Sequence, residues 1–472
     1  MKRTLQRSWL IFILVIAFLV GMAFLVVETI FGASDWVDQP YNGHIAGAGG
    51  LLEAGVISDR NGNVLAQTVD DKRVYNKDED VRKALLHVVG DDTLNISTAI
   101  QSQFRSQLTG YSFIWGLDMP GSFRGGSDVN LTVDADTCKT AYNALKEYDS
   151  GACVIYNYKT GEIICDVSTK TYDPNSPPEI TKDNEDEYEG VYLDNVLSST
   201  YTPGSIFKIV TAAAAIENIP DIWDRTWTCN GKEEIDGGDV TCVEAHGTVN
   251  LKEAFGHSCN IVFAELAVEL GDDIMTETAK KMGINSSFTV SGIKTKAGNY
   301  DISKATTHQL AWSGVGQYED KVNPMQMAIL CGAIANGGTP INPYLVDGTS
   351  GSLLKDMGLT GSASKGKELL SPDTAKSLKE LMRYAVENDY GNDMFGGLTV
   401  CAKTGTGETF IGEGNDKNDG WMVGFATDKD VPLAFACIVR GSDNYGYSTA
   451  GQVAKAAMIQ AADSLRNNDD DE

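Results

Sequence analysis

The expectations for this chain start from one stretch, YTPGSIFKIVTAAAA (201–215). Its Pro203-Gly204 pair ends an incoming loop, so Ser205 is expected to open a helix over 205–218. Ser205 and Lys208 are three residues apart and would share one helix face. A neighbouring amine can activate a weak serine nucleophile, and the free N–H groups of a helix start favour a developing oxyanion. The stretch therefore predicts a nucleophilic serine.

Ser-x-x-Lys spacing alone is weak evidence, because the pattern starts at Ser205, Ser291, Ser352, Ser362 and Ser364. The ordinary interpretation of such a pair is a capping serine near a solvated lysine. Only Ser205 opens an apolar segment whose other face can be buried. The other four lie in stretches rich in Gly, Ser and Lys, and we expect them on the surface.

A second motif, Ser258-Cys259-Asn260, lies between a short helix (251–256) and an apolar helix (260–271). A hydroxyl and a carboxamide on one side of a turn can serve as a proton relay and a hydrogen-bonding anchor. An ordinary helix-capping serine is the alternative. A rival copy, Ser442-Asp443-Asn444, follows the last predicted strand.

A third motif, Lys403-Thr404-Gly405-Thr406, ends a predicted strand rich in small residues. Glycine on a strand allows another backbone to approach closely, so a peptide could add along that edge. The lysine and the threonine hydroxyls would hold a substrate carboxylate. A second copy, Lys159-Thr160-Gly161, is expected to form only a hairpin turn.

Composition narrows the possible functions. The 472 residues carry 38 Lys and Arg against 65 Asp and Glu, a net charge of −27. The length suggests about two to three domains with ample core. So acidic a surface repels phosphate backbones, which argues against nucleic-acid binding.

The N-terminus predicts a single membrane pass. Residues 9–27 form a charge-free apolar run, preceded by Lys2, Arg3 and Arg7. The positive-inside rule then places residues 1–8 in the cytoplasm, a transmembrane signal-anchor at 9–31, and the rest outside the cell membrane. A signal peptide cleaved near the small residues 32–34 is the alternative.

The remaining pattern predicts an α+β protein, with helices packed on an antiparallel sheet. A smaller mixed domain is expected at 35–127, a main domain at 128–465, and an acidic tail at 466–472. Hairpins are expected at 56–68 and 152–168, and a solvated loop at 174–190. Three- and four-residue apolar spacing predicts helices at 205–218, 260–271, 325–338 and 373–388. Three strands (397–405, 420–428 and 432–441) and a last helix (449–466) would end the chain.

The nine cysteines leave the redox state open. Cys229 with Cys242, or Cys153 with Cys165, could form a disulfide in an exported protein. No CxxC motif or clustered Cys/His pattern occurs along the chain. The sequence therefore predicts no metal site.

The three motifs occur in the order Ser-x-x-Lys, Ser-x-Asn, Lys-Thr-Gly, which is typical of the serine penicillin-recognising enzymes. The chain resembles a monofunctional (class B) penicillin-binding protein, a peptidoglycan D,D-transpeptidase, and is most similar to the shorter members from Gram-positive bacteria. The resemblance continues outside the motifs, in GVISDRNGNVLA (55–66), NLTVDADTCKTAYNAL (130–145), CVEAHGTVNLKEAFGHSCNIVFAELAVELG (242–271) and GVGQYEDKVNPMQMAILCGAIANGG (314–338). The chain departs from the family pattern at Ala54, usually basic, and at Tyr318 and Ala402, usually glycine.

The resemblance implies a penicillin-binding transpeptidase fold: an antiparallel sheet flanked by helices, an all-helical lobe, an N-terminal transmembrane helix, and a pedestal or dimerisation-like domain at 35–127. It implies that Ser205 attacks the D-Ala-D-Ala bond of a donor stem peptide, and that an amine acceptor then takes the acyl group. Lys208 would be the general base, with its pKa lowered by burial and by Lys403. Ser258 would relay the proton and Asn260 would orient Lys208.

The same resemblance implies that Thr404, Gly405 and Thr406 bind substrate, and that the backbone N–H groups of Ser205 and Thr406 form the oxyanion hole. It implies no cofactor, covalent inhibition by β-lactams, and a membrane glycan polymerase as partner in cell wall organisation during growth or division. Two other functions stay open. A D,D-carboxypeptidase or β-lactamase would need a water-activating base, which the sequence does not reveal. A non-catalytic β-lactam sensor or wall-synthesis scaffold would not need the intact motifs.

Overall fold

The computed structural model describes residues 9, 11–26, 51, 54–109, 126–350, 361–410 and 416–469. Its centre is a five-stranded antiparallel sheet in the order β14-β15-β16-β5-β6. The bounds are Ser150–Asn157 for β5, Ile163–Thr169 for β6, Val400–Phe410 for β14, Asp416–Ala426 for β15 and Leu433–Ser442 for β16. β14 is an edge strand of this sheet, which leaves one side open to another chain segment.

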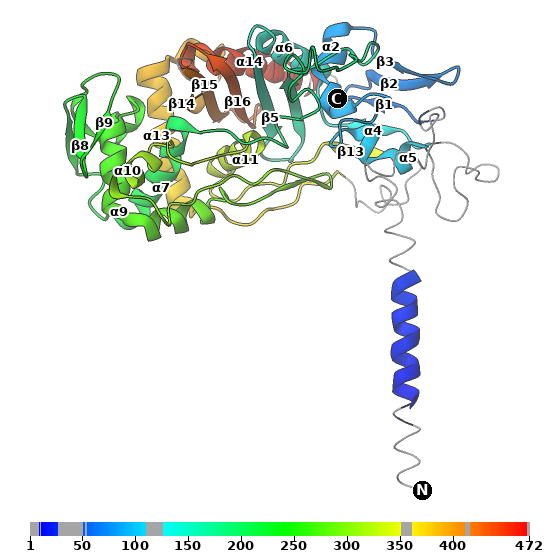
Figure 1. Cartoon of the computed structure of the whole chain (residues 1–472), viewed down its shortest axis with the longest axis horizontal. Coiled ribbons are helices and arrows are strands. Elements are labelled where there is room, and N and C mark those ends of the chain that lie inside the picture. The colour runs from blue at the N-terminus through cyan, green and yellow to red at the C-terminus, as the bar shows by residue number, and fades with distance from the viewer. Residues whose placement is uncertain are drawn as a thin grey trace.

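Helices cover both faces of this sheet (Figure 1). α6 (Ala135–Leu145) and α14 (Ala450–Asp469) pack on one face, and α11 (Pro324–Ala335) packs on the other. This explains why the central strands β5 and β16 are apolar almost without interruption and buried on both sides. The predicted α+β class and the antiparallel sheet are confirmed.

Beside this sheet lies a region rich in helices, at the left of Figure 1. It contains η3 (Gly204–Phe207), α7 (Lys208–Asn218), α8 (Leu251–Gly256), α9 (Asn260–Lys281), α10 (Thr307–Ser313) and α13 (Pro372–Ala385). The helix predicted for 260–271 is longer than expected. Gly271 has a φ of 78° and kinks α9, which then continues as a second helical segment to Lys281.

The expected all-helical lobe is wrong in detail, because short antiparallel pairs interrupt the helices. β7 (Thr226–Cys229) pairs with β10 (Gly247–Asn250), β8 (Lys232–Ile235) with β9 (Gly238–Thr241), and β11 (Thr289–Val290) with β12 (Ile293–Lys294). Asp236-Gly237 forms the turn between β8 and β9, with φ of 50° and 75°. Two consecutive residues with positive φ form a two-residue hairpin turn, which is incompatible with a continuous helix at this point.

A second five-stranded sheet has the order β13-β4-β1-β2-β3. Its strands are β1 (Ile57–Ser58), β2 (Val64–Val69), β3 (Lys72–Tyr75), β4 (Val129–Leu131) and β13 (Val346–Thr349). Four short helices lie between β3 and β4 in the chain: α2 (Glu79–Ala84), α3 (Leu86–Val89), α4 (Ile100–Gln103) and α5 (Arg105–Thr109). The hairpin predicted at 56–68 is confirmed as β1 and β2. Two of the five strands come from residues beyond 128.

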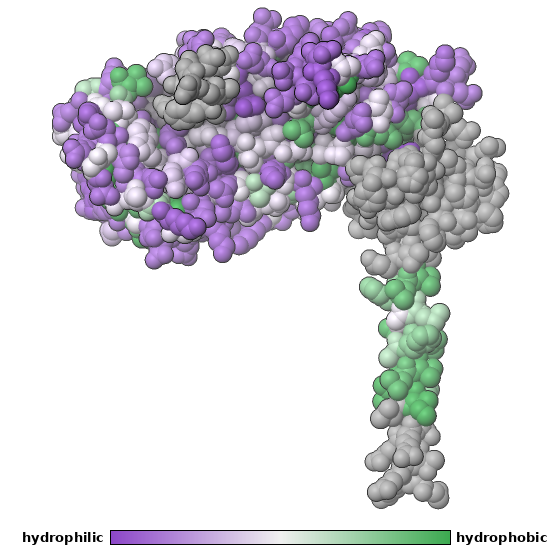
Figure 2. Space-filling model, in the orientation of Figure 1, coloured by the Kyte–Doolittle hydropathy of each residue, from purple (hydrophilic) through white to green (hydrophobic). Residues whose placement is uncertain are grey.

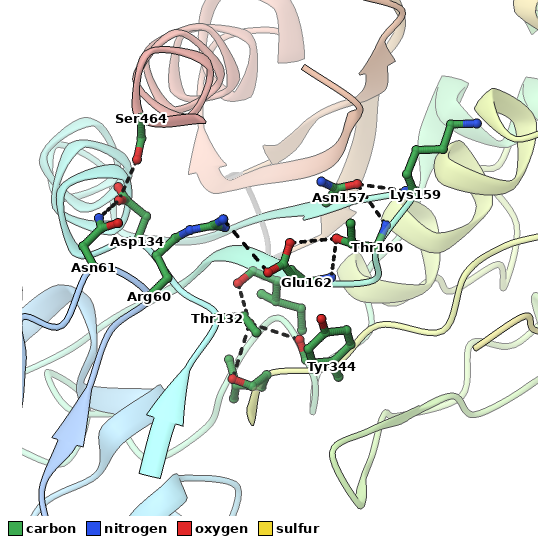
Figure 3. A network of polar contacts seen from close by, with 12 residues as sticks. Arg60, Asn61, Thr132, Asp134, Asn157, Lys159, Thr160, Glu162, Tyr344 and Ser464 are labelled. Atoms are coloured by element: carbon green, nitrogen blue, oxygen red, sulfur yellow. Dashed lines mark hydrogen bonds and ion pairs between the residues drawn. The ribbon is translucent and has the colours of Figure 1, made fainter. Parts of the chain in front are cut away.

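Polar contacts join the two sheets (Figure 3). The Asp134 carboxylate accepts hydrogen bonds from Asn61 Nδ2 at 2.7 Å and from Ser464 Oγ, on the last helix, at 2.8 Å. The Thr132 hydroxyl donates to the carbonyl of Ile163 on β6 at 2.8 Å. One carboxylate thus connects the β1–β2 turn, the start of α6 and the C-terminal helix, which holds the second sheet against the main body.

Residues 11–26 are helical and exposed, and Figure 2 shows them as a hydrophobic column, in contrast to the mostly hydrophilic surface of the body. Among the described residues, no helix has both the length and the hydropathy needed to cross a membrane. Residues 1–8, 10 and 27–31, which belong to the predicted tail and anchor, lie outside the described residues.

Candidate active site

Ser205 lies in the 3-10 turn η3, directly before α7, as predicted from Pro203-Gly204. Gly204 has a φ of 53°, and a Cβ there would meet the carbonyl oxygen of Thr406 at 2.2 Å. Only glycine therefore permits this turn to lie against strand β14. The close approach places Ser205 beside the third motif.

Lys208, the first residue of α7, is fully buried, and its amine has four oxygen neighbours. Lys208 Nζ donates to Ser205 Oγ at 3.0 Å, to Ser258 Oγ at 3.0 Å, to the Ser258 carbonyl at 2.6 Å and to Asn260 Oδ1 at 2.7 Å. Burial lowers the pKa of this amine well below its ordinary value, and the nearby charge of Lys403 lowers it further. A lowered pKa leaves more of the amine in its neutral form, and a neutral amine can accept a proton as a base.

Ser258 lies in the turn between α8 and α9 and has a φ of 56°, an unusual conformation for a non-glycine residue. Contacts at the starts of α8 and α9 hold the two helices that flank this turn. Asn250 and Glu253 form a capping box at the start of α8. Asn260, the first residue of α9, donates from Nδ2 to the Thr241 carbonyl at 2.8 Å. The Ser258 hydroxyl is thereby held in reach of two lysines.

Lys403 reaches the same hydroxyl from strand β14. Lys403 Nζ donates to Ser258 Oγ at 3.0 Å and to the Thr404 carbonyl at 3.0 Å. The side chain is fully buried, and desolvation lowers the pKa of Lys403 to about 7, opposed by the charge of Asp389. At Gly405, a Cβ would meet the Pro203 carbonyl oxygen at 2.7 Å, which explains glycine at this position.

The three predicted motifs therefore converge on one place. A cavity of about 350 Å³ opens over them, and its lining includes Ser205, Ser258, Asn260, Thr404, Gly405 and Thr406. Lys208 and Lys403 are both buried, and each amine contacts Ser258 Oγ at 3.0 Å. The arrangement supplies a hydroxyl nucleophile, a buried amine base, a relay hydroxyl and an open strand edge for a peptide.

Several residues at the site were not predicted. The cavity lining also includes Val243, His246, His257, Val315, Gln317, Asn418 and Tyr445. Gln317 Nε2 donates to the Thr406 carbonyl at 2.9 Å, which ties the third motif to the loop after α10. Thr404 donates from its backbone N–H and its hydroxyl to Tyr390 OH, at 3.1 and 3.0 Å. Tyr390 ends a π-helical turn, and no local sequence signal marks it.

Replacing Tyr390 by phenylalanine should lower the second-order rate constant for acylation by penicillin roughly 5- to 30-fold. Two hydrogen bonds that hold Thr404 would be lost, each worth about 1 kcal/mol net. Stopped-flow acylation measures the effect. Tyr447→Phe is the control. The Tyr447 hydroxyl donates to the Tyr390 carbonyl at 3.2 Å and has no hydrogen bond to Thr404 among the described residues, so its loss should lower the rate less. An unchanged rate for Tyr390→Phe would show that Thr404 needs no such support.

The rival motif copies lie elsewhere. Lys159-Thr160-Gly161 forms the turn between β5 and β6, as predicted. Ser442 ends β16, and its hydroxyl accepts the backbone N–H of Asn444 at 3.1 Å, an ordinary turn contact. Ser291 Oγ accepts the backbone N–H groups of Leu345 and Val346. Ser362 and Ser364 line a separate cavity near 280–289, and Ser352 lies outside the described residues.

Neither candidate disulfide is formed, since all nine cysteines, which lie among the described residues, are free thiols. Cys153 and Cys165 are not opposite each other, because β5 and β6 pair Cys153 with Val167 and Ile155 with Cys165. The Sγ atoms of Cys229 and Cys242 lie 3.7 Å apart. The expectation that no Cys/His cluster exists is wrong: the fold brings Cys229, Cys242, His246 and Cys259 together. Strand pairing creates this cluster, which residue spacing alone did not reveal.

Comparison with known proteins points the same way. A family model for the penicillin-binding protein transpeptidase domain matches residues 151–459. Peptidoglycan D,D-transpeptidase PbpA of Mycolicibacterium smegmatis is 27% identical over 355 residues, which cover 70% of this chain and 70% of that protein. Penicillin-binding protein 3 of Bacillus subtilis is 29% identical over 370 residues, covering 73% of this chain and 53% of that one.

Solved structures show the same fold. The ceftriaxone acyl-enzyme complex of penicillin-binding protein A from Mycobacterium tuberculosis superposes with a TM-score of 0.74 at 24% identity. The match covers 88% of this chain and 99% of that one. The crystal structure of Pseudomonas aeruginosa PBP2 gives a TM-score of 0.69 at 21% identity, covering 86% and 95% of the two chains.

Proposed function

This chain belongs to the penicillin-binding protein transpeptidase family, and on that basis we propose that it is a serine D,D-transpeptidase that cross-links peptidoglycan stem peptides. One observation carries the proposal: the buried Lys208 amine contacts the Ser205 hydroxyl, the Ser258 hydroxyl and Asn260 at once. This is the geometry of an activated serine nucleophile with a proton relay beside it.

In the acylation step, Ser205 Oγ attacks the carbonyl carbon between the two terminal D-alanines and transfers its proton to Lys208 Nζ. Ser258 Oγ lies 3.0 Å from Lys208 Nζ and can pass a proton towards the leaving nitrogen. The C–N bond then breaks and releases D-alanine. In the second step, the amine of a neighbouring stem peptide attacks the ester carbonyl, forms the cross-link and returns the proton to Ser205.

The donor peptide would lie along the open edge of β14. Lys403 and the hydroxyls of Thr404 and Thr406 would bind its terminal carboxylate. The backbone N–H groups of Ser205 and Thr406 would form the oxyanion hole, and one such donor is typically worth about 2.7–4 kcal/mol. The contact between Gly204 and the Thr406 carbonyl supports this assignment, because it places the two backbone segments side by side. The proposed acyl transfer needs no cofactor for its chemical steps, and a β-lactam would acylate Ser205 as an analogue of the D-alanyl dipeptide.

Acylation should depend on pH with opposite signs for the two lysines. Lys208 must be neutral to accept a proton, so the rate should rise with pH through the lowered pKa of Lys208. Lys403 must be charged to attract a carboxylate, so the rate should fall as it deprotonates near its pKa of about 7. Second-order rate constants for penicillin across pH 5–10 would measure both limbs.

Lys403→Arg keeps its charge throughout this range and should remove only the alkaline limb. A rate that rises steadily beyond pH 9 in the unaltered chain would contradict these charge assignments.

The full chain, incubated with a D-Ala-D-Ala peptide and an amine acceptor, tests transpeptidation against hydrolysis. We expect acceptor-dependent cross-linked product and a penicillin acyl-enzyme that persists for minutes or longer. Acyl-enzyme release within seconds, with the free acid as sole product, would instead identify a carboxypeptidase or β-lactamase. Rescue of a depletion strain by a Ser205→Ala copy would identify a non-catalytic scaffold or sensor.

The remaining features of the proposal concern location. The apolar segment at 9–31 would anchor the chain in the cell membrane with residues 1–8 in the cytoplasm and the catalytic domain outside, supported by Lys2, Arg3 and Arg7 before it. The part at 35–127 would act as a pedestal or dimerisation-like domain beneath the transpeptidase domain at 128–465. A membrane glycan polymerase would supply the strands to be cross-linked.

A further inference from the structure

Three thiols and one imidazole meet beside the active site. The ligand atoms of Cys229, Cys242, His246 and Cys259 all lie within 4.8 Å of one another. Cys242 Sγ is 3.7 Å from Cys229 Sγ and 3.8 Å from Cys259 Sγ. His246 Nδ1 is 3.3 Å from Cys229 Sγ. Cys242 is thus in contact with both other cysteines at nearly equal distances.

We propose that these four side chains bind one zinc ion. In a tetrahedral site with Zn–S bonds of about 2.3 Å, two sulfurs lie about 3.8 Å apart, which matches both Cys242 separations. Three thiolates and an imidazole are a common structural zinc ligand set, and soft sulfur ligands in tetrahedral geometry select this metal over magnesium or calcium. The spacing C-x12-C-x3-H-x12-C is unlike the short-range zinc motifs, because strand pairing rather than sequence proximity assembles the cluster.

A disulfide would explain the cluster less completely. Bonding Cys229 to Cys242 would require their sulfurs to move to about 2.05 Å and would leave Cys259 and His246 without a role. A disulfide between Cys242 and Cys259 would likewise exclude Cys229. A single metal ion uses all four groups with little movement.

The surrounding backbone suits metal-bound thiolates. Cys229 ends β7, opposite Gly247 on β10, which brings His246 to the same end of this pair. Cys259 lies at the N-cap position of α9, and the Asn260 backbone N–H donates to Cys242 Sγ at 3.2 Å. The positive end of a helix dipole favours negative charge at this place. Cys229 and Cys259 are buried, whereas Cys242 and His246 are partly exposed and leave a path for the metal to enter.

The zinc would also position the catalytic turn. Cys259 is flanked by Ser258 and Asn260, which both contact the Lys208 amine. Zinc ligation would fix Cys259 to the β7–β10 pair and thereby hold Ser258 in its left-handed conformation. This positioning effect rests on the proposed function, whereas zinc binding itself does not.

The test measures metal in the full chain, purified in detergent under mild reduction and desalted into metal-free buffer. We expect one zinc ion per chain by mass spectrometry of the elements. Cys229→Ser and His246→Ala should each lose most of this zinc, while Cys331→Ser, a buried thiol outside the cluster, should keep it. The proposal would be overturned if the unaltered chain held only trace zinc, or if the Cys229→Ser and His246→Ala variants held as much zinc per chain as the unaltered protein.

Cobalt gives a second readout that needs no variant. Co²⁺ added to chelator-treated chain should produce the intense absorption of tetrahedral thiolate-bound cobalt; a weak octahedral spectrum would overturn the site. Chelation should slow penicillin acylation roughly 10- to 100-fold, and Zn²⁺ should restore it. Zinc that is bound but whose removal leaves acylation unchanged would overturn the positioning effect alone. A zinc-loaded chain that penicillin does not acylate would instead refute the proposed function.

Discussion

Replacing Ser205 by alanine is expected to lower D-alanine release from a donor peptide by roughly 10⁴- to 10⁶-fold, to near background. Removing the attacking oxygen leaves the lysines and the strand edge in place, but no acyl-enzyme can form. In serine hydrolases the loss of a catalytic residue has effects of this size. Release of D-alanine under saturating donor measures the change.

Two controls make this result specific. Ser442→Ala alters the rival motif, whose hydroxyl serves a turn, and should keep full activity. The melting temperature of Ser205→Ala should stay near that of the unaltered chain, because Ser205 is only half-buried. Residual activity above a few per cent in a folded Ser205→Ala chain would show that another group is the nucleophile.

Replacing Lys208 by methionine should slow acylation by roughly 10²- to 10⁴-fold, the range expected for loss of a general base. Methionine approximates the lysine stem in volume but cannot accept a proton. Lys208→Arg should be equally slow, because arginine keeps its charge at any working pH. The second-order rate constant for fluorescent penicillin, measured on the folded variants, distinguishes these outcomes.

The arginine variant separates two explanations. If Lys208 acted only through its positive charge, Lys208→Arg would retain most of the activity and Lys208→Met would not. Lys159→Met, in the turn between β5 and β6, is a matched control, since this exposed lysine belongs to the rival Lys-Thr-Gly copy. It should acylate at the unaltered rate.

Much of the site could be predicted from short-range sequence signals. Pro203-Gly204 marks the start of a helix, and the apolar face of 205–218 distinguishes Ser205 from four other serines with a lysine three residues on. Gly405 indicates a close backbone approach, and the structure places the Pro203 carbonyl there. These predictions succeeded because turn chemistry and helix periodicity are local properties.

What the sequence did not reveal depends on tertiary packing. Tyr390 reaches Thr404 from a π-helical turn that follows α13, and nothing in 386–390 signals this contact. The cluster of Cys229, Cys242, His246 and Cys259 forms only because β7 pairs with β10 and α9 begins beside them. The small strand pairs in the helical region depend on turns such as Asp236-Gly237. The strands on either side of this turn, β8 and β9, show no clear alternation of apolar and polar residues in the sequence.

If Ser205, activated by Lys208, is the nucleophile, penicillin must form its ester on this residue. Peptide mapping of the full chain after brief exposure to penicillin tests it most directly. We predict one adduct per chain, on the peptide that contains Ser205 and on that residue. An adduct on Ser258, on Cys242 or on any other side chain would contradict it, as would a folded chain that forms no adduct.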